Sequence, residues 1–216
     1  MKKKFVISSI LLAAFAIWTI LVSYVDLQPI GPMDSIVGLA TLNHWFHDLT
    51  GVHIGLYHIT DRLSILPLGI VFFFALKGLF QWMQRKSLLL VDYDLLALGG
   101  FYAVVMAVFI FFEICVINYR PILIDGILEA SYPSSTTMLA MCVMPTAGIQ
   151  VHKNVRKPVI KRILSGMITG FTVFMVIARI VSGVHWLTDI VAGALLSAGL
   201  VVLYHAVCSL KENSAL

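Results

Sequence analysis

Long apolar runs dominate the chain and restrict most strongly what it can fold into. Six segments are rich in aliphatic and aromatic residues and nearly free of charge, over residues 5–25, 62–83, 94–117, 134–151, 163–181 and 186–208. A run of about 20 apolar residues can cross a bilayer as a helix. Only helices and closed barrels satisfy their backbone groups in lipid, and these runs are too long and too uniformly apolar for barrel strands. The sequence therefore predicts an all-α integral membrane bundle of six transmembrane helices.

Composition supports this fold class. The chain is 60% hydrophobic and 12% charged, whereas about a quarter of the residues of a soluble domain are charged. We treat residues 1–216 as a single membrane domain, with a short interfacial helical segment after the first span. The apolar run after Lys2 to Lys4 is interpreted as a retained helix, because no small-residue cleavage site of an export signal follows it.

The basic residues predict an orientation. Twelve of the 15 Lys and Arg residues fall at the N-terminus, after the second run, between the fourth and fifth runs, or in the C-terminal tail. With six spans these places share one face, which the positive-inside rule identifies as cytoplasmic. The termini are then cytoplasmic, and loops 26–61, 118–133 and 182–186 are extracytoplasmic. Basic clusters interleaved with aromatic residues, as in nucleic-acid-binding proteins, are absent from the sequence.

Ionisable residues stand at the junction of the last two runs. Arg179, His185 and Asp189 lie where one apolar segment ends and the next begins, and ionisable groups so placed in a membrane protein commonly mark a functional site. Four residues separate His185 from Asp189, so a helix would bring both to one face. The carboxylate could then fix one tautomer of the imidazole and leave its other nitrogen free as base, ligand or nucleophile. The Arg179 guanidinium suits a phosphate or carboxylate.

The second outer loop adds groups of matching chemistry. Arg120 follows the third run, and Ser134, Ser135 and Thr136 open the fourth run after a proline. These hydroxyls can cap a helix start, and a helix N-terminus attracts anions. Two arginines, a hydroxyl-rich helix start and the His–Asp pair are thus expected on one membrane face, as an anion site with a nucleophile. We expect neither a metal nor another cofactor.

Three motifs resemble the signature of the type 2 phosphatidic acid phosphatases, a family of integral membrane lipid phosphatases. They are Arg179-x5-His185-x3-Asp189, Pro133-Ser134 at a helix start, and Arg120-Pro121. The resemblance implies that His185 attacks phosphorus to form a phosphohistidine and that Asp189 orients it. It also implies that Arg120, Arg179 and the serines Ser134 and Ser135 bind the phosphate of a lipid phosphate or diphosphate.

The chain departs from the family pattern at three positions. Glu113 stands where the family has Lys, Thr136 where it has the His that protonates the leaving oxygen, and Ala178 where it has Ser. General acid help is typically worth about 10²–10⁴-fold, so its absence favours a substrate with a good leaving group, such as a polyprenyl diphosphate. Glu113 has two interpretations: an ion pair with Arg120 or Arg179, or a replacement proton donor whose pKa is raised by burial.

Other functions compete with phosphatase activity. A noncatalytic relative could keep the arginines and bind or carry phospholipid headgroups, whereas a small-solute transporter gains little support because no repeated half is evident. In loop 26–61, His44, His47 and Asp48 could suggest a metal site. The favoured interpretation is an interfacial amphipathic segment that covers the mouth of the site.

Overall fold

Helices build almost the whole molecule. The structure, a computed structural model, describes residues 2–214, with the side chains of residues 211–214 left out. The helices are α1 (Lys2–Tyr24), η1 (Pro32–Asp34), α2 (Ala40–Thr50), α3 (Ile54–Leu63), α4 (Ile65–Arg85), η2 (Leu88–Leu90), α5 (Tyr93–Ile114), α6 (Ser135–Asn154), α7 (Pro158–Ser182) and α8 (Leu187–Ser214). Within the described residues there are only isolated β-bridges, so the predicted all-α class is confirmed.

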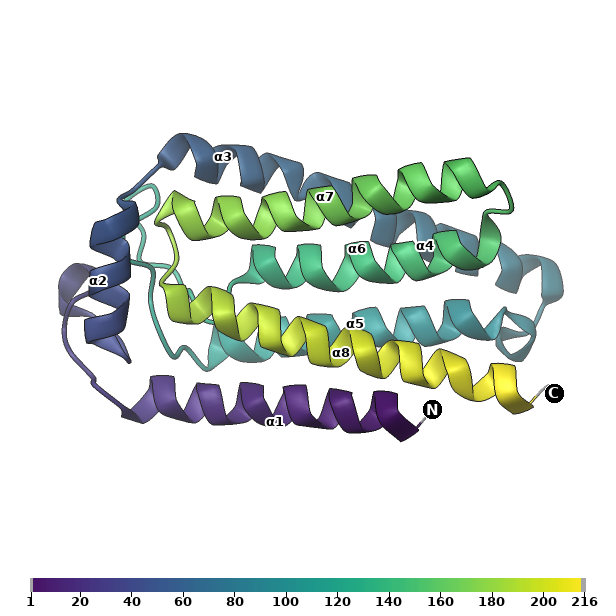
Figure 1. The fold of residues 1–216 in the computed structure, drawn as a ribbon, viewed down its shortest axis with the longest axis horizontal. Helices are drawn as coiled ribbons and strands as arrows, with labels where there is room; N and C mark the ends of the chain where they lie inside the picture. The colour runs from purple at the N-terminus through teal and green to yellow at the C-terminus, as the bar shows by residue number, and fades with distance from the viewer. Residues whose placement is uncertain (1, 215–216) are drawn as a thin grey trace.

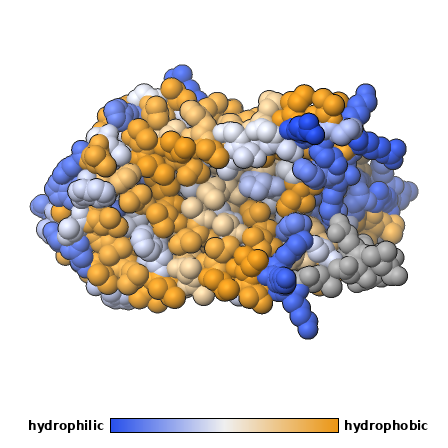
Figure 2. Space-filling model, viewed as in Figure 1, coloured by the Kyte–Doolittle hydropathy of each residue, from blue (hydrophilic) through white to orange (hydrophobic). Residues whose placement is uncertain are grey.

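The long helices run side by side along the long axis of the molecule, and α2 lies across one end (Figure 1). Both described ends of the chain lie at the opposite end of the bundle. Hydrophobic residues cover the middle of the visible face, and hydrophilic residues gather at its two ends (Figure 2). This surface pattern is that of a protein embedded in a bilayer with its two ends in water.

Five helical stretches of the described chain are long and apolar enough to cross a membrane: Lys2–Tyr24, Ile54–Arg85, Tyr93–Ile114, Pro158–Ser182 and Leu187–Leu210. The protein is therefore a multi-pass membrane protein, but the prediction of six spans is not confirmed. The second stretch begins at Ile54, eight residues before its predicted start. The predicted run 134–151 is helical as α6, yet α6 is not among the five.

The low apolarity of α6 follows from its place inside the bundle. It packs against α4, α5, α7 and α8, so much of its surface meets protein instead of lipid. Its polar side chains find partners there: the Thr146 hydroxyl donates to the carbonyl of Cys142 at 2.8 Å, and Gln150 Nε2 donates to the Tyr204 hydroxyl at 2.9 Å. Polar residues in a membrane bundle are tolerated where they hydrogen-bond between helices.

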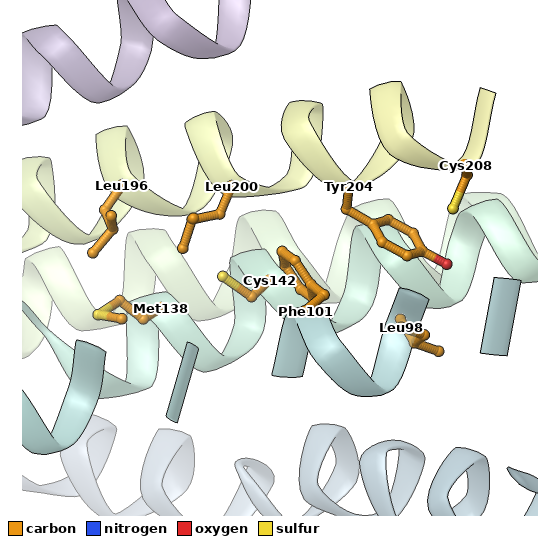
Figure 3. Packing of buried hydrophobic residues seen from close by; sticks show 8 residues of the cluster. All are labelled: Leu98, Phe101, Met138, Cys142, Leu196, Leu200, Tyr204 and Cys208. Atoms are coloured by element: carbon orange, nitrogen blue, oxygen red, sulfur yellow. The ribbon is translucent and has the colours of Figure 1, made fainter. Parts of the chain in front are cut away.

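A buried cluster ties α6 to its neighbours (Figure 3). It joins residues of α5, α6 and α8, namely Leu98, Phe101, Met138, Cys142, Leu196, Leu200, Tyr204 and Cys208. The cluster follows α8 from Leu196 to Cys208, so it fixes the relative positions of the three helices. Their ends near α2, where the polar residues gather, are fixed as a consequence.

The predicted segment after the first span is a set of short helices. Loop 26–61 contains η1, α2 and most of α3, where one short interfacial helical segment was predicted. Asn43 on α2 is buried, and its amide donates to the Thr188 hydroxyl at 2.9 Å while its oxygen accepts from the Thr188 N–H at 3.2 Å. Trp45 is 60% exposed on the same helix. A short helix, α2, thus lies in the loop where an interfacial helical segment was expected.

Candidate active site

The α5–α6 loop carries two site residues on a hairpin-like stretch. Tyr119 and Ala130 form an antiparallel bridge. The Arg120 N–H donates to the Glu129 carbonyl at 3.1 Å, and the Ser131 N–H donates to the Asn118 carbonyl at 2.9 Å. This pairing fixes Arg120 and Ser131 on opposite arms of the loop.

A glycine turn carries the chain from α7 to α8. Gly183 has φ of +66°, and a Cβ there would lie 2.0 Å from the Gly51 carbonyl oxygen. Only glycine fits both the left-handed backbone and the close approach. The His53 N–H donates to the Ser182 carbonyl at 2.9 Å, so the start of α3 is held against this turn. His185 follows two residues later.

Two buried guanidinium groups face one aromatic ring. Tyr57, on α3, has its ring centre 5.7 Å from Cζ of Arg120 and 4.9 Å from Cζ of Arg179. Arg179 Nη1 donates to the Thr60 hydroxyl at 3.1 Å, and Nη2 donates to the Thr136 hydroxyl at 2.7 Å. The predicted convergence of the two arginines is therefore confirmed, and α3 supplies part of their environment.

Three nitrogen atoms in this region are buried with neither a hydrogen bond nor an ion pair among the described residues, whereas Nε of Arg120 is also without a hydrogen bond but lies 3.0 Å from Oε2 of Glu129. The three are Nη1 of Arg120, Nε of Arg179 and Nε2 of His185. A buried N–H group that lacks an acceptor costs free energy, more so when it is charged. An oxyanion between the two guanidinium groups would supply the missing acceptors, so the arrangement fits an anion such as phosphate.

The His–Asp pair does not meet directly. His185 Nδ1 lies 4.0 Å from Asp189 Oδ2, too far for the predicted hydrogen bond. The Ser131 hydroxyl lies between them, 2.9 Å from Nδ1 and 2.5 Å from Oδ2. His185 precedes α8, which begins at Leu187, so the spacing expected on one helix face does not hold.

The carboxylate of Asp189 is surrounded by donors. Its Oδ2 accepts from the Trp186 N–H at 3.0 Å, and its Oδ1 accepts from Nδ2 of Asn118 at 3.1 Å. With Ser131 these donors keep the fully buried carboxylate satisfied. Asp189 is therefore fixed in position without help from the imidazole.

The environment of His185 favours a neutral imidazole. Burial lowers the pKa of His185 well below its ordinary value, and the positive charges of Arg120 and Arg179 lower it further. A lowered pKa means that protonation requires a lower pH than usual, so the ring should stay mostly neutral at pH 6.5, near the ordinary histidine pKa.

We expect ¹⁵N NMR of the full chain in detergent to show a mostly neutral His185 ring at pH 6.5. The His185 signals are identified by their loss in the His185→Asn variant. Half or more of His185 protonated at pH 6.5 would contradict the prediction.

The hydroxyl groups at the α6 start have different surroundings. Ser134 is buried, its N–H donates to the Asp189 carbonyl at 3.0 Å, and its hydroxyl accepts from Thr137 at 3.1 Å. Ser134 is the N-cap residue, but its side chain makes no capping hydrogen bond, which corrects the expected cap. Thr136, where the family pattern has His, accepts from Arg179.

The proposed pairing of Glu113 with an arginine is wrong. Glu113 is exposed, and among the described residues Arg120 pairs with Glu129, whose Oε2 lies 3.0 Å from its Nε. The two-turn spacing argument assumed one helix, but α5 ends at Ile114 and the chain leaves the helix before Arg120. An exposed carboxylate also lacks the burial that the proton-donor interpretation required.

An apolar groove adjoins the site on the flank of the bundle. Its volume is about 270 Å³, and its walls are apolar side chains of α4, α5 and α6. Asp61, Ser64, Ser135 and Thr136 give it a polar end. Since the Thr136 hydroxyl also contacts Arg179, the polar end of the groove lies beside Arg179. Among residues 2–210, no group of three or more His, Cys, Asp or Glu side chains is arranged to hold a metal ion.

Comparison with known proteins identifies a family by sequence and a similar fold by structure. The sequence model of the PAP2 superfamily matches residues 68–212. A crystal structure of a transmembrane PAP2-type phosphatidylglycerolphosphate phosphatase from Bacillus subtilis superimposes with a TM-score of 0.64 at 17% identity. The alignment covers 94% of this chain and 96% of that chain. No curated protein matches the sequence significantly. Tyr57 and Thr60, which contact the arginines, lie outside the matched residues.

Proposed function

The chain belongs to the PAP2 superfamily, and from this membership and the geometry of the site we propose that it hydrolyses a lipid phosphate or diphosphate. The observation that carries the proposal is the set of buried nitrogens without partners on Arg120, Arg179 and His185. Two of these belong to guanidinium groups that can bind phosphoryl oxygens, and the third can act as a nucleophile.

The reaction proceeds by attack of His185 Nε2 on phosphorus. The N–P bond forms as the P–O bond to the leaving group breaks, and the leaving oxygen keeps the electron pair of that bond. Arg120 and Arg179 stabilise the charge on the phosphoryl oxygens. Water then cleaves the phosphohistidine, releasing phosphate and restoring the imidazole.

A lipid is the substrate class that the surroundings favour. The apolar groove between α4, α5 and α6 reaches Thr136, beside Arg179, so a lipid tail in the groove would direct its head group at the arginines. We propose that α6 is a sixth span, shielded from lipid by its neighbours. The termini are then cytoplasmic and the site is extracytoplasmic, because most basic residues lie at the other end of the bundle.

The leaving group follows from Thr136. The Thr136 hydroxyl accepts a hydrogen bond from Arg179 and is a much weaker acid than a protonated histidine. The residue that stands where the family has its proton-donating His therefore does not protonate the departing oxygen. A diphosphate substrate needs less help because its leaving group is a phosphate. We therefore propose a lipid diphosphate, such as a polyprenyl diphosphate, as the preferred substrate.

Two substrates with the same tail test the leaving-group preference. The full chain in detergent should hydrolyse a polyprenyl diphosphate with a kcat/KM at least about 10²-fold above that for the matching monophosphate, the lower end of general acid effects. Thr136→His, which restores the family residue, should narrow this ratio. Equal kcat/KM values for the two substrates would refute the preference. Binding of both lipids without release of phosphate would instead support the noncatalytic alternative.

A further inference from the structure

The hydroxyl of Ser131 occupies the space between the nucleophile and the carboxylate. It is buried, 2.9 Å from His185 Nδ1 and 2.5 Å from Asp189 Oδ2, whereas those two atoms are 4.0 Å apart. A hydrogen-bonded link between Asp189 and the imidazole therefore passes through Ser131.

The hydrogen bonds have a direction because a hydroxyl carries one proton. Ionised Asp189 can only accept, so Ser131 donates its proton to Oδ2. The oxygen of Ser131 can then only accept from the ring, so the neutral imidazole must carry its proton on Nδ1. Nε2 is left with a free lone pair, and it is the ring nitrogen without a partner among the described residues.

The surrounding chain fixes Ser131 for this contact. Its N–H donates to the Asn118 carbonyl at 2.9 Å, and the side chain of Asn118 donates to Asp189 Oδ1 at 3.1 Å. The amide of Asn118 is itself oriented, because its Oδ1 accepts from the Gly38 N–H at 3.2 Å. Ser131 and Asp189 are thus held by the same asparagine, one through its backbone and the other through its side chain.

We infer that Ser131 is a positioning residue that relays the tautomer preference of Asp189 to His185. The inference rests on the proposed function for its catalytic consequence, though not for its geometry. During attack the proton stays on Nδ1, shared with Ser131, while the bond between Nε2 and phosphorus forms. The positive charge that develops on the ring is stabilised through the Ser131–Asp189 hydrogen bond.

The tautomer of His185 tests the relay without any substrate. In ¹⁵N NMR of the full chain at neutral pH, wild-type His185 should be protonated at Nδ1 and unprotonated at Nε2. Ser131→Ala removes the acceptor, so a substantial Nε2–H population should appear. Ser131→Thr keeps a hydroxyl and should restore the wild-type tautomer. An Nε2–H tautomer in the wild type, or no change in Ser131→Ala, would overturn the relay.

Kinetics then separate the relay from the proposed function. Ser131→Ala should slow phosphoenzyme formation by about 10²-fold, the scale of a lost positioning contact, with little change in KM. Ser8→Ala is the matched control, because Ser8 is also buried and donates to the Gly199 carbonyl at 2.8 Å, on a different part of the bundle. A chain that releases no phosphate but has the expected tautomers would refute the function and keep the relay. An active chain whose rate of phosphoenzyme formation is unchanged by Ser131→Ala would refute the relay and keep the proposed function.

Discussion

Replacing His185 with asparagine is expected to abolish the phosphoenzyme and to lower phosphate release by about 10⁴-fold or more, the scale at which loss of a nucleophile acts. The asparagine side chain can still reach the Ser131 hydroxyl, which is 2.9 Å from Nδ1 in the wild type, but it has no atom at the position of Nε2. The variant should therefore fold and bind lipid, yet be unable to form the N–P bond.

The measurement is capture of the labelled enzyme after rapid mixing with ³²P-lipid. Phosphohistidine survives alkali and is lost in acid, so an alkaline quench should label the wild type alone. His152→Asn is the control, because His152 is exposed in the last turn of α6, at the opposite end of that helix from Thr136; it should behave as the wild type. Labelling of His185→Asn would rule out His185 as the nucleophile, and an unlabelled but active wild type would point to direct attack by water.

The fold was largely predictable because its main signal is local. A bilayer forces an apolar run of about 20 residues into a helix, and all six predicted runs are helical. Apolarity alone did not predict that one of these helices, α6, packs against four others inside the bundle. The segment that became α6 carries Thr146 and Gln150, whose partners lie in its own helix and on α8, and sequence periodicity does not reveal such a tertiary environment.

The site was predictable to the level of helix ends. Arg120, Arg179, His185 and Asp189 were expected on one face from the order of the spans. In the structure both guanidinium groups lie near His185, and His185 Nδ1 is 4.0 Å from Asp189 Oδ2. Ser131 was missed because its role depends on pairing within the α5–α6 loop, which leaves no periodic signal. The sequence singles out Ser131 only by its position two residues before the Pro133-Ser134 motif.

The contribution of α3 was hidden for a different reason. Tyr57 and Thr60 lie in a stretch with mixed polarity that the sequence suggested was loop, and they touch Arg179 from 119 or more residues away in the chain. Such contacts depend on how α3 packs against α7, which neither composition nor motif spacing specifies. The structure thus adds a wall of the site that the signature residues do not include.

Arg179→Lys keeps the positive charge but is expected to be a severe substitution, because a lysine cannot replace the contacts of Arg179 with Thr60 and Thr136. We expect kcat/KM to fall by about 10²–10³-fold, as for the loss of one transition-state hydrogen-bond donor. The guanidinium uses Nη1 for Thr60 and Nη2 for Thr136 and leaves Nε without a partner in the described chain. A lysine has one nitrogen on a flexible stem, so it cannot make both anchoring bonds and still present a donor in a fixed direction.

Inhibition by orthovanadate measures the loss of this hydrogen-bond donor separately from binding of the lipid tail, because orthovanadate resembles the transferred phosphoryl group and has no tail. The inhibition constant should rise in Arg179→Lys in parallel with the fall in kcat/KM, since both depend on the same donor. Arg62→Lys, at an exposed position on α3, is the matched control and should keep wild-type values for both. Full activity in Arg179→Lys would mean that a point charge suffices, and the anchoring by Thr60 and Thr136 would then have no part in catalysis.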